Sequence, residues 1–402
     1  MFLDATEGAL SLTAETEGPL SGIRIVELPA VGPVPFAAML MADLGADVIR
    51  VDRCSAVDAG PGDALAAVFA GTDHVGRSRR RIAVDLKEAD GVEVVLALAE
   101  RSDVLLEGFR PGVAERLGVG PDVVLLRNPR LVFGRLTGWG QDGPLAGVVG
   151  HDIGYLATSG ALDGIGTSAG PIAPVGVAGD YPSALLAVVG VLAALSERER
   201  SGRGQVVDAA ILDTVLLTAS VDRFMRVQDG WGPRGTNALD GGSHFYRCYR
   251  TADDRWVSFG AVEPQFHDEM LRCLGIDPEP VQQYDSAAWP ELAERVQAVI
   301  GTATAEAWVA RLAGRDVCFA PVLSHQEAAV HPHITARGGL LPGAGAPQAA
   351  PAPRFSRTPP PPPRATAPPG AHSVDVLSDL GLPAHRIKRL LASGAVAQAA
   401  HP

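Results

Sequence analysis

One segment of this sequence, residues 22–53, constrains the fold more than any other. It reads GIRIVELPAVGPVPFAAMLMADLGADVIRVDR. Residues 23–28 form a short β-branched run, and residues 35–44 favour a helix that ends at Gly45. The next residues, 46–51, are strand-like again. A strand, a helix and a strand at this spacing predict a right-handed βαβ unit of a parallel sheet.

The same alternation continues along the first half of the chain. Residues 103–107 and 131–136 favour strands, with two short helices between them. A long helix is expected over 182–198, and residues 205–220 favour a strand and then a helix. We therefore predict an α/β fold with a doubly wound, Rossmann-like parallel sheet. The first strand-to-helix turn, residues 29–35, lacks the glycines of a dinucleotide fingerprint, so no nicotinamide or flavin site is expected.

The composition of the sequence changes over residues 222–240, where Gly, Asn, Asp and Trp occur without a helical or strand period. This change predicts a domain boundary. Beyond it, residues 245–251 and 256–262 alternate around a turn and predict a β-hairpin. Helical patterns then cover three segments: 265–274, 289–300 and 305–312. Together these elements predict a compact, smaller α+β domain.

The last part of the chain begins with a segment rich in Pro, Ala and Gly, residues 339–370. Such a segment is expected to run extended over the surface as a stiff strap. Helical character resumes over 374–391, so the chain is expected to return to the large domain. The predicted domains are a large domain (1–221), a small domain (222–338), and a strap with C-terminal helices (339–402).

Composition narrows the class of partner. The chain has 34 basic and 46 acidic residues, a net charge of −12, and its two lysines are Lys87 and Lys388. A nucleic-acid partner is not expected, because phosphate neutralisation needs clustered positive charge. The longest apolar run, residues 184–195, is too short for a membrane span and predicts a buried helix. The four cysteines are far apart, which argues against a zinc site and favours a reducing, cytoplasmic location.

Three titratable residues stand where a catalytic and a structural role are both open. His151 and Asp152 form a loop pair of the kind that often caps a helix or lies on the surface. Asp180 precedes an apolar helix, where an N-cap is the simpler role. Glu263 precedes Pro264, where a first-turn helix acid is expected. The local patterns alone do not decide between the two roles.

Seven short motifs follow one another along the sequence. They are residues 41–53 (MADLGADVIRVDR), 85–87 (DLK), 137–144 (TGWGQDGP), 150–153 (GHDI), 202–209 (GRGQVVDA), 239–242 (LDGG) and 260–266 (GAVEPQF). In this order, over most of residues 22–340, they resemble the family III CoA transferases, the CaiB/BaiF family. Within that family the resemblance is greatest to the racemases of α-methylacyl-CoA thioesters.

The resemblance implies a large Rossmann-like domain built from both chain ends, a small α+β domain, and an interlocked homodimer. Each active site would be shared between the large domain of one subunit and the small domain of the other. The implied substrate is an acyl-CoA thioester. CoA would be part of that substrate, and the resemblance implies no separate cofactor, no metal and no membrane partner.

The implied reaction inverts the configuration of the carbon next to the thioester carbonyl. His151 and Asp180 match the two catalytic bases of the racemases, one removing the α-proton and the other delivering a proton to the opposite face. An imidazole, with a reference pKa of about 6.5, can both accept and return a proton near neutral pH. Glu263 matches an active-site glutamate, which we expect to orient and charge His151 across the dimer interface. The enolate intermediate also needs oxyanion donors, for which backbone N–H groups near Asp180 or Ile153 are candidates.

The residues expected to bind CoA or the acyl group match the family segments or lie beside them. Guanidinium groups among them suit phosphate oxygens. The expected set is Arg53, Arg77, Arg81, Val84, Asp85, Leu86, Lys87, Arg110, Gly150, Asp152, Ile153, Gly154 and Tyr155.

The sequence departs from the racemase pattern after Asp180. Tyr181 and Pro182 stand where the family has a glycine-rich loop, which predicts a tighter or differently shaped pocket. Two other functions therefore stay open. Asp180 would be the nucleophile of a CoA transferase that forms an anhydride, or the chain would bind acyl-CoA without catalysis. The intact His151–Asp152 pair and the Glu263-Pro264-Gln265 stretch favour the racemase.

Overall fold

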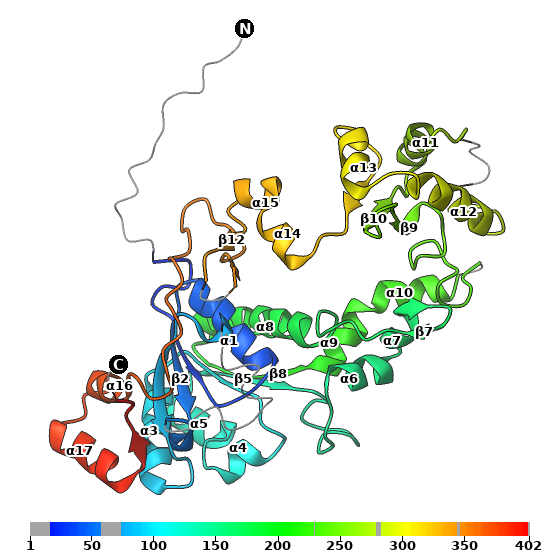
Figure 1. Ribbon diagram of the computed structural model, residues 1–402. Helices are drawn as coiled ribbons and strands as arrows, with labels where there is room; N and C mark the ends of the chain where they lie inside the picture. Colours follow the sequence, from blue (N-terminus) through cyan, green and yellow to red (C-terminus); the bar gives the residue numbers. More distant parts are fainter. Residues whose placement is uncertain (1–16, 58–73, 229, 279–282, 344–345, 401–402) are drawn as a thin grey trace. The chain divides into compact units, whose positions relative to one another are not determined.

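The computed structural model describes residues 17–57, 74–228, 230–278, 283–343 and 346–400. The chain divides into two compact units, each built from separated segments (Figure 1). The first unit comprises Met1–Val149, Asp180–Ile211 and Leu341–Pro402. The second comprises Gly150–Gly179 and Leu212–Leu340.

A seven-stranded sheet forms the centre of the first unit. In chain order its strands are β1 (Arg24–Glu27), β2 (Asp47–Asp52), β3 (Arg80–Val84), β4 (Val104–Glu107), β5 (Val132–Thr137), β8 (Val206–Ala210) and β14 (Val396–Ala397). The spatial order is β14-β3-β2-β1-β4-β5-β8, and all neighbours pair in parallel except β14. Without β14 this is the 3-2-1-4-5-6 order of Rossmann-like sheets. The predicted α/β fold is confirmed.

Helices cover both faces of this sheet because successive strand residues point to opposite sides. Ile25 packs with α1 (Pro33–Asp43) and α8 (Asp180–Ser201) in one apolar core. Val26 packs in a second core on the other face, against α3 (Ala89–Glu100) and two C-terminal helices, α16 (Ser373–Asp379) and α17 (Ala384–Ser393). Two short helices, α4 (Val113–Arg116) and α5 (Pro121–Arg127), belong to this second layer. The unit is thus a three-layer α/β/α sandwich.

The helix α8 is long and apolar enough, by length and composition alone, to cross a membrane, and it is the one such helix among the described residues. In the structure its Ala184, Ala187 and Val191 side chains are buried in the sheet core. The sequence predicted a buried helix here, and one face of α8 is buried in this way.

Three strands of the sheet end in a buried carboxylate that contacts an arginine. Glu27 ends β1, and its Oε2 lies 2.7 Å from Nε of Arg79, with both side chains fully buried. Asp52 ends β2 and accepts two hydrogen bonds from Arg81, at 2.7 and 2.8 Å. Each carboxylate has a neutralising cation at hydrogen-bond distance, which buried charges require.

The third of these carboxylates is Glu107, which ends β4 and bonds Nε of Arg135 at 2.8 Å. Burial raises the pKa of Glu107, and the hydrogen bonds from the Phe109 N–H and from Arg135 only partly offset that effect. The charge of Glu107 therefore depends on the hydrogen bonds from the Phe109 N–H and from Arg135.

The C-terminal segment returns to the first unit, as the resumption of helical character predicts. The strap reaches β3 through Ser78, whose backbone N–H donates to the Arg364 carbonyl at 3.0 Å and whose Oγ accepts from the Arg364 N–H at 3.0 Å. Farther on, the His372 N–H donates to the Arg81 carbonyl and β14 pairs antiparallel with β3, opposite Val84. The last strand of the chain thereby covers one edge of the sheet.

The second unit has a three-stranded antiparallel sheet in the order β11-β10-β9. Its strands are β9 (Tyr246–Arg250), β10 (Trp256–Gly260) and β11 (Phe319–Pro321). One face packs on α11 (Pro264–Cys273), α12 (Trp289–Ile300) and α13 (Ala305–Leu312) around a core that contains Tyr249, Val257 and Phe259. The predicted hairpin and all three predicted helices are present.

Shorter elements complete the two units. They are the 3₁₀ turns η1 (Cys54–Ala56) and η2 (His74–Gly76), the helices α6 (Asp152–Ser159), α7 (Ala161–Gly164), α9 (Ile211–Thr218), α10 (Ser220–Arg226), α14 (His325–Ala329) and α15 (Pro332–Ala336), and the strand pairs β6 (Gly166–Thr167) with β7 (Gly170–Pro171) and β12 (Leu340–Leu341) with β13 (Gln348–Ala349).

The boundary predicted after residue 221 differs from the observed division, because residues 150–179 and 212–221 belong to the second unit. The physical reason is a set of contacts distant in sequence. Arg226 of α10 bonds Asp222 at 2.7 Å and approaches Asp163 of α7 at 3.3 Å. Arg234 donates to the Asp163 carbonyl at 2.6 Å. No change of composition at residue 150 signals these contacts.

Replacing Arg79 by Met should destabilise the protein by about 3–5 kcal/mol, because Glu27 would stay buried without that cation. Arg80→Met is the matched control, since the partners of Arg80 are the more exposed Asp47 and Asp379, and its cost should stay below about 1 kcal/mol. Urea unfolding followed by circular dichroism measures both. Equal losses in the two variants would show that burial of the pair does not set its importance.

Candidate active site

The strand order of the first unit reverses beside β1, whose neighbours are β2 and β4. In open α/β sheets ligands bind at such a switch point, outside the carboxyl ends of the strands. The loops that leave β1 and β4 are packed closely here. A Cβ at Gly108, after β4, would lie 3.3 Å from Cβ of Ala30 in the loop after β1 and 2.8 Å from Cγ2 of Val34 at the start of α1. Glycine at 108 is therefore required by the close approach of the two loops.

Asp180 lies at this switch point. A Cβ on Gly32, in the loop after β1, would be 3.8 Å from Oδ2 of Asp180. Gly32 also has φ +69°, a conformation that other residues rarely adopt. Asp180 is the first residue of α8, where the positive end of the helix dipole favours a carboxylate. The sequence placed Asp180 at the start of an apolar helix, and the fold adds its proximity to the loop after β1.

The Tyr181-Pro182 departure has a visible structural consequence. The ring of Tyr181 packs against Phe36 of α1, with ring centroids 4.9 Å apart. The Ser183 Oγ donates to the Asp180 carbonyl at 2.6 Å and tightens the first turn of α8. An aromatic contact and a hydroxyl therefore fix the backbone beside Asp180, where the family pattern has flexible glycines.

His151 is the N-cap residue of α6 in the second unit. Its carbonyl accepts the Gly154 N–H at 2.8 Å, but its imidazole makes no capping hydrogen bond. The side chain is exposed. Of the two roles left open by the sequence, the imidazole does not perform the capping one.

Glu263 is the N-cap residue of α11, with Pro264 at the first helical position. Its carbonyl accepts the N–H groups of Phe266 and His267, each at 3.0 Å, whereas its carboxylate makes no capping bond. Burial raises the pKa of the Cys318 thiol, and the negative charge of Glu263 raises it further. Glu263 is therefore an electrostatic neighbour of Cys318. No hydrogen bond between Glu263 and His151 is present among the described residues of this chain.

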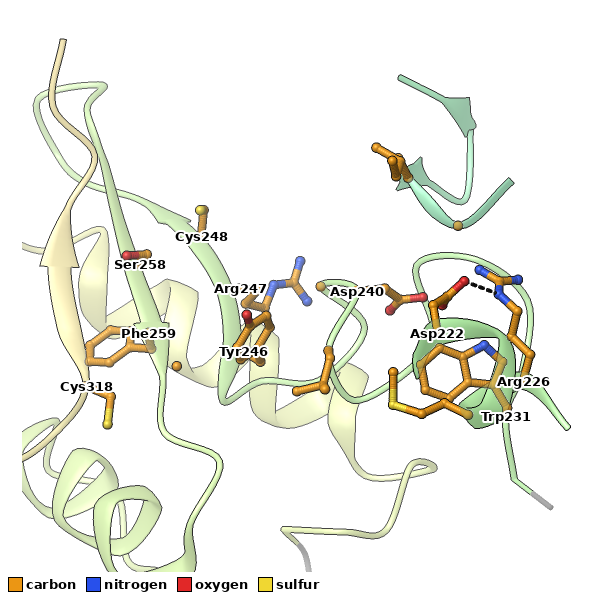
Figure 2. Close-up of a pocket in the computed structure, with 17 residues that line it drawn as sticks. Asp222, Arg226, Trp231, Asp240, Tyr246, Arg247, Cys248, Ser258, Phe259 and Cys318 are labelled. Carbon is orange, nitrogen blue, oxygen red and sulfur yellow. Dashed lines mark hydrogen bonds and ion pairs between the residues drawn. The ribbon is translucent and has the colours of Figure 1, made fainter. Parts of the chain in front are cut away.

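A pocket of about 670 Å³ opens beside Cys318 in the second unit (Figure 2). Tyr246 and Cys248 of β9 line it together with Ser258 of β10, which is the register partner of Cys248. The remainder of its lining combines apolar and charged side chains: Met225, Trp231, Leu239 and Phe259 with Asp222, Arg226, Asp240 and Arg247. This pocket was not predicted from the sequence. The alternation of residues along β9 is the sequence feature that indicates it, because this alternation leaves Tyr246 and Cys248 on the open face of the sheet.

Two buried histidines form a pair, and one of them belongs to α11, the helix that follows Glu263. His244 and His267 are 0% and 1% exposed, and their Nε2 atoms lie 2.8 Å apart. Nδ1 of His267 lies 3.1 Å from Oδ1 of Asp268, a carboxylate that accepts a hydrogen bond from the protonated nitrogen. Nε2 of His267 is then the acceptor, and His244 carries its proton on Nε2. Nδ1 of His244 accordingly has no partner in the structure.

Three cationic residues of the predicted CoA set follow strands of the parallel sheet. Arg53 follows β2, Lys87 follows β3, and Arg110 follows β4, and all three are exposed. The carboxyl ends of parallel strands meet at one edge of a sheet, so these cations share that edge. The C-terminal segment supports two of their loops: the Asp85 N–H donates to the Ala395 carbonyl at 3.0 Å, and Sγ of Cys54 lies 3.6 Å from the Gly394 carbonyl.

Arg77 and Arg81, predicted to bind phosphate, are occupied within the fold. Arg77 bonds Asp43 with two guanidinium nitrogens, and also the Ala349 carbonyl at 2.9 Å. Arg81 bonds Asp52, as described above, and the Ala367 carbonyl at 2.9 Å. Both residues are nearly fully buried. This correction has a physical cause, because their carboxylate partners lie on α1 and β2, distant in sequence from the arginine run.

The other predicted substrate residues divide by exposure. Val84 is buried in β3, and Leu86 packs against the apolar core, so their side chains serve the fold. Tyr155 is buried in α6, whereas Ile153 in the same helix is 51% exposed. Gly150, Asp152 and Gly154 are half-buried around the start of α6. Within the described ranges, no group of three His, Cys, Asp or Glu side chains could hold a metal ion, and all four cysteines are free.

Comparison with known proteins gives consistent relatives. The profile of "CoA-transferase family III" matches residues 20–373. The α-methylacyl-CoA racemase of Mus musculus is 40% identical over 380 residues, which cover 92% of this chain and 96% of the relative. The succinyl-CoA–L-malate CoA-transferase β subunit of Chloroflexus aurantiacus is 32% identical over 64% of this chain and 65% of its own length. The crystal structure of a CAIB/BAIF family protein from Brucella suis has a TM-score of 0.76 at 24% identity, covering 90% of this chain and 100% of that one, so the fold is shared.

The buried histidine pair makes stability depend on pH. Burial, the neighbouring His267 and the charge of Arg247 lower the pKa of His244 to about 3, against about 6.5 when unfolded. The unfolded chain therefore binds the extra proton, and stability falls as the pH falls from 6.5 towards 3. Between pH 6.5 and 5 this amounts to roughly 1.5 kcal/mol for one such group.

Urea unfolding at several pH values, followed by tryptophan fluorescence, measures this effect. His244→Gln should reduce the loss of stability between pH 6.5 and 5 by that amount. His325→Gln, at an exposed histidine of the same unit, should leave the pH dependence unchanged. A pH dependence that is identical in wild type and His244→Gln would contradict the assignment of a neutral, buried His244.

Proposed function

This chain belongs to CoA-transferase family III, and from that premise we propose that it is an isomerase that inverts the α-carbon of 2-methylacyl-CoA thioesters. The reaction is a two-base proton transfer through an enolate, with His151 and Asp180 as the bases. The observation that carries the proposal is the position of Asp180 at the switch point of the sheet, where Rossmann-like folds bind ligands.

The chemistry requires a base on each face of a planar enolate. Asp180 begins a 22-residue helix, which stabilises its carboxylate form. His151 has an exposed imidazole without a capping bond, so it is available to accept or return a proton. The backbone N–H of Ile153, in the first turn of α6, has no acceptor within the helix and is proposed to donate to the enolate oxygen.

Substrate recognition is proposed to depend on the CoA moiety. Arg53, Lys87 and Arg110 are exposed at the carboxyl edge of the sheet and supply cations for the phosphates. Proton transfer at the carbon next to the thioester needs only the two bases and the thioester itself, so no cofactor beyond the CoA of the substrate is proposed. Four free cysteines support the further proposal of a reducing, cytoplasmic location.

We also propose a homodimer with shared active sites, in which Glu263 of one subunit orients and charges His151 of the other. Two observations support it. Glu263 and His151 are not bonded to each other within one chain. Apolar side chains are exposed along α8 (Leu185, 52%; Val189, 60%) and along α10 (Phe224, 66%), as expected of surfaces that a partner covers.

The reaction itself is tested with a chiral 2-methylacyl-CoA in D₂O, following α-deuterium uptake and optical inversion together. Wild type should show both. His151→Ala and Asp180→Ala should each lower inversion at least about 10²-fold, because each removes one of the two proton donors. Arg127→Ala, at an exposed ion pair distant in the sequence from these bases, is the control and should retain full activity. Full inversion by either base variant would overturn the two-base assignment.

The shared site is tested by mixing two variants expected to have low residual activity, His151→Ala and Glu263→Gln, under conditions that exchange subunits. In a mixed dimer one site contains both substitutions and the other contains neither. Since about half of the dimers are mixed, activity should return to about a quarter of wild type. If His151 and Glu263 act within one subunit, no activity returns, and the shared site is wrong.

A CoA transferase is the second candidate, because the family includes such enzymes and the Chloroflexus relative is one. In that mechanism Asp180 attacks the thioester and forms a mixed anhydride, with release of the CoA thiolate. The thiolate attacks the Asp180 carbonyl, which releases the first acid and leaves an Asp180–CoA thioester. A second carboxylate then attacks this thioester to form a new anhydride, and the thiolate cleaves that anhydride at the acyl carbonyl, giving the new acyl-CoA and free Asp180. The same preparation, given a free carboxylic acid and hydroxylamine, distinguishes the two. A trapped hydroxamate at Asp180 with acyl transfer identifies the transferase, and CoA-ester binding with neither activity identifies a binding protein.

A further inference from the structure

The second unit contains a polar chain that the proposed chemistry does not use. It runs from Nε2 of His244 to Nε2 of His267 at 2.8 Å, and from Nδ1 of His267 to Asp268 at 3.1 Å. The two rings are nearly perpendicular, with centroids 5.0 Å apart and an interplanar angle of 71°. The ring of Phe245 packs edge-on against both, with its centroid 5.2 Å from that of His244 and 6.2 Å from that of His267. Burying a polar chain in such a core costs free energy of folding, and a functional role would account for its presence.

The position of His267 indicates that use. Its backbone N–H donates to the Glu263 carbonyl at 3.0 Å, and its side chain bonds His244. One residue therefore connects the N-cap of α11 to the segment that enters β9. His244 is two residues before Tyr246, which lines the pocket beside Cys318. The first turn of α11 is thus bonded to the segment before β9 by an imidazole–imidazole hydrogen bond, and nearby the Ala261 N–H donates to the Phe245 carbonyl at 2.9 Å.

Other contacts fix the neighbouring backbone but not the helix itself. Nε2 of Gln283 and Oη of Tyr284 donate to the Val262 carbonyl at 2.8 and 3.1 Å. These bonds fix the residue before Glu263. The direction in which the Glu263 carboxylate leaves the backbone depends in addition on the first turn of α11, which His267 holds.

We propose that the hydrogen bond between His244 and His267 positions the carboxylate of Glu263, so that both histidines are positioning residues of the active site. This inference rests on the proposed function, in which Glu263 orients His151. Neither histidine contacts substrate. A displacement of about 1 Å at a catalytic group lowers rates by up to about 10²-fold, which gives a single buried bond a measurable effect.

The test compares His244→Phe, which fills the same space without the bond, with His244→Gln, whose amide can donate to Nε2 of His267. Both are assayed as full-length protein for α-proton exchange of a 2-methylacyl-CoA in D₂O. In His244→Phe, kcat should fall about tenfold while KM changes less than about twofold, because the proposed CoA cations lie in the other unit. His244→Gln should recover most of kcat. Ile300→Val, which removes a buried methyl group of the same core, should keep the wild-type kcat.

Coupling to Glu263 separates positioning from a general structural effect. If the pair acts through Glu263, the double variant His244→Phe/Glu263→Gln should be no slower than Glu263→Gln alone. Multiplied losses in the double variant would overturn the inference. So would a wild-type kcat in His244→Phe.

The remaining outcomes separate this inference from the proposed function. Full activity of Glu263→Gln overturns the role of Glu263 in the proposed function and the inference with it. Loss in Glu263→Gln without loss in His244→Phe overturns the inference alone. Should His244→Phe not fold, Asp268→Ala takes its place, because this side chain is partly exposed and fixes the protonation of His267. In that variant a kcat fall of about threefold, coupled to Glu263, is expected, and an unchanged kcat overturns the inference.

Discussion

The stability of the first unit depends on arginines that neutralise carboxylates buried at the ends of three adjacent strands. Glu27 and Asp52 bring negative charge into a core that excludes water, and Arg79 and Arg81 enter the same core to meet them. Arginine suits this role because its planar group donates several hydrogen bonds in fixed directions. These pairs fix β3 beside β2, and with it the sheet edge where the exposed cations lie. The scarcity of lysine in this acidic chain fits the same requirement.

The candidate catalytic residues share a structural position, the start of a helix. His151 precedes α6, Asp180 begins α8 and Glu263 precedes α11. A helix start fixes the backbone through the bonds of its first turn, yet leaves the side chain directed away from the helix body. It also provides unpaired N–H groups that favour negative charge. Such positions combine rigidity with electrostatic support for carboxylates and for an enolate, which proton transfer beside a thioester needs.

Much of this architecture was predictable from local patterns, and the exceptions share a cause. The helices over 289–300 and 305–312 were predicted with their observed bounds, because their apolar periods are regular. The strand β3 was missed, since its arginines resemble a solvated surface or a phosphate site until their partners on β2 are known. The candidate bases were found through family motifs, whereas the His244–His267 bond joins a loop to a helix and leaves no periodic signal.

The pairing of β14 with β3 has a consequence for how the chain reaches its native state. Opposite Val84, the edge of the sheet is covered by Val396 and its neighbour in β14, which are synthesised long after β3. Until these residues leave the ribosome, β3 exposes a row of unpaired N–H and C=O groups, which invites association with other chains. Contacts between such distant segments also form slowly, because a long loop must close first. Sheet completion in this protein therefore comes late in synthesis, and loss of β14 threatens solubility before it affects chemistry.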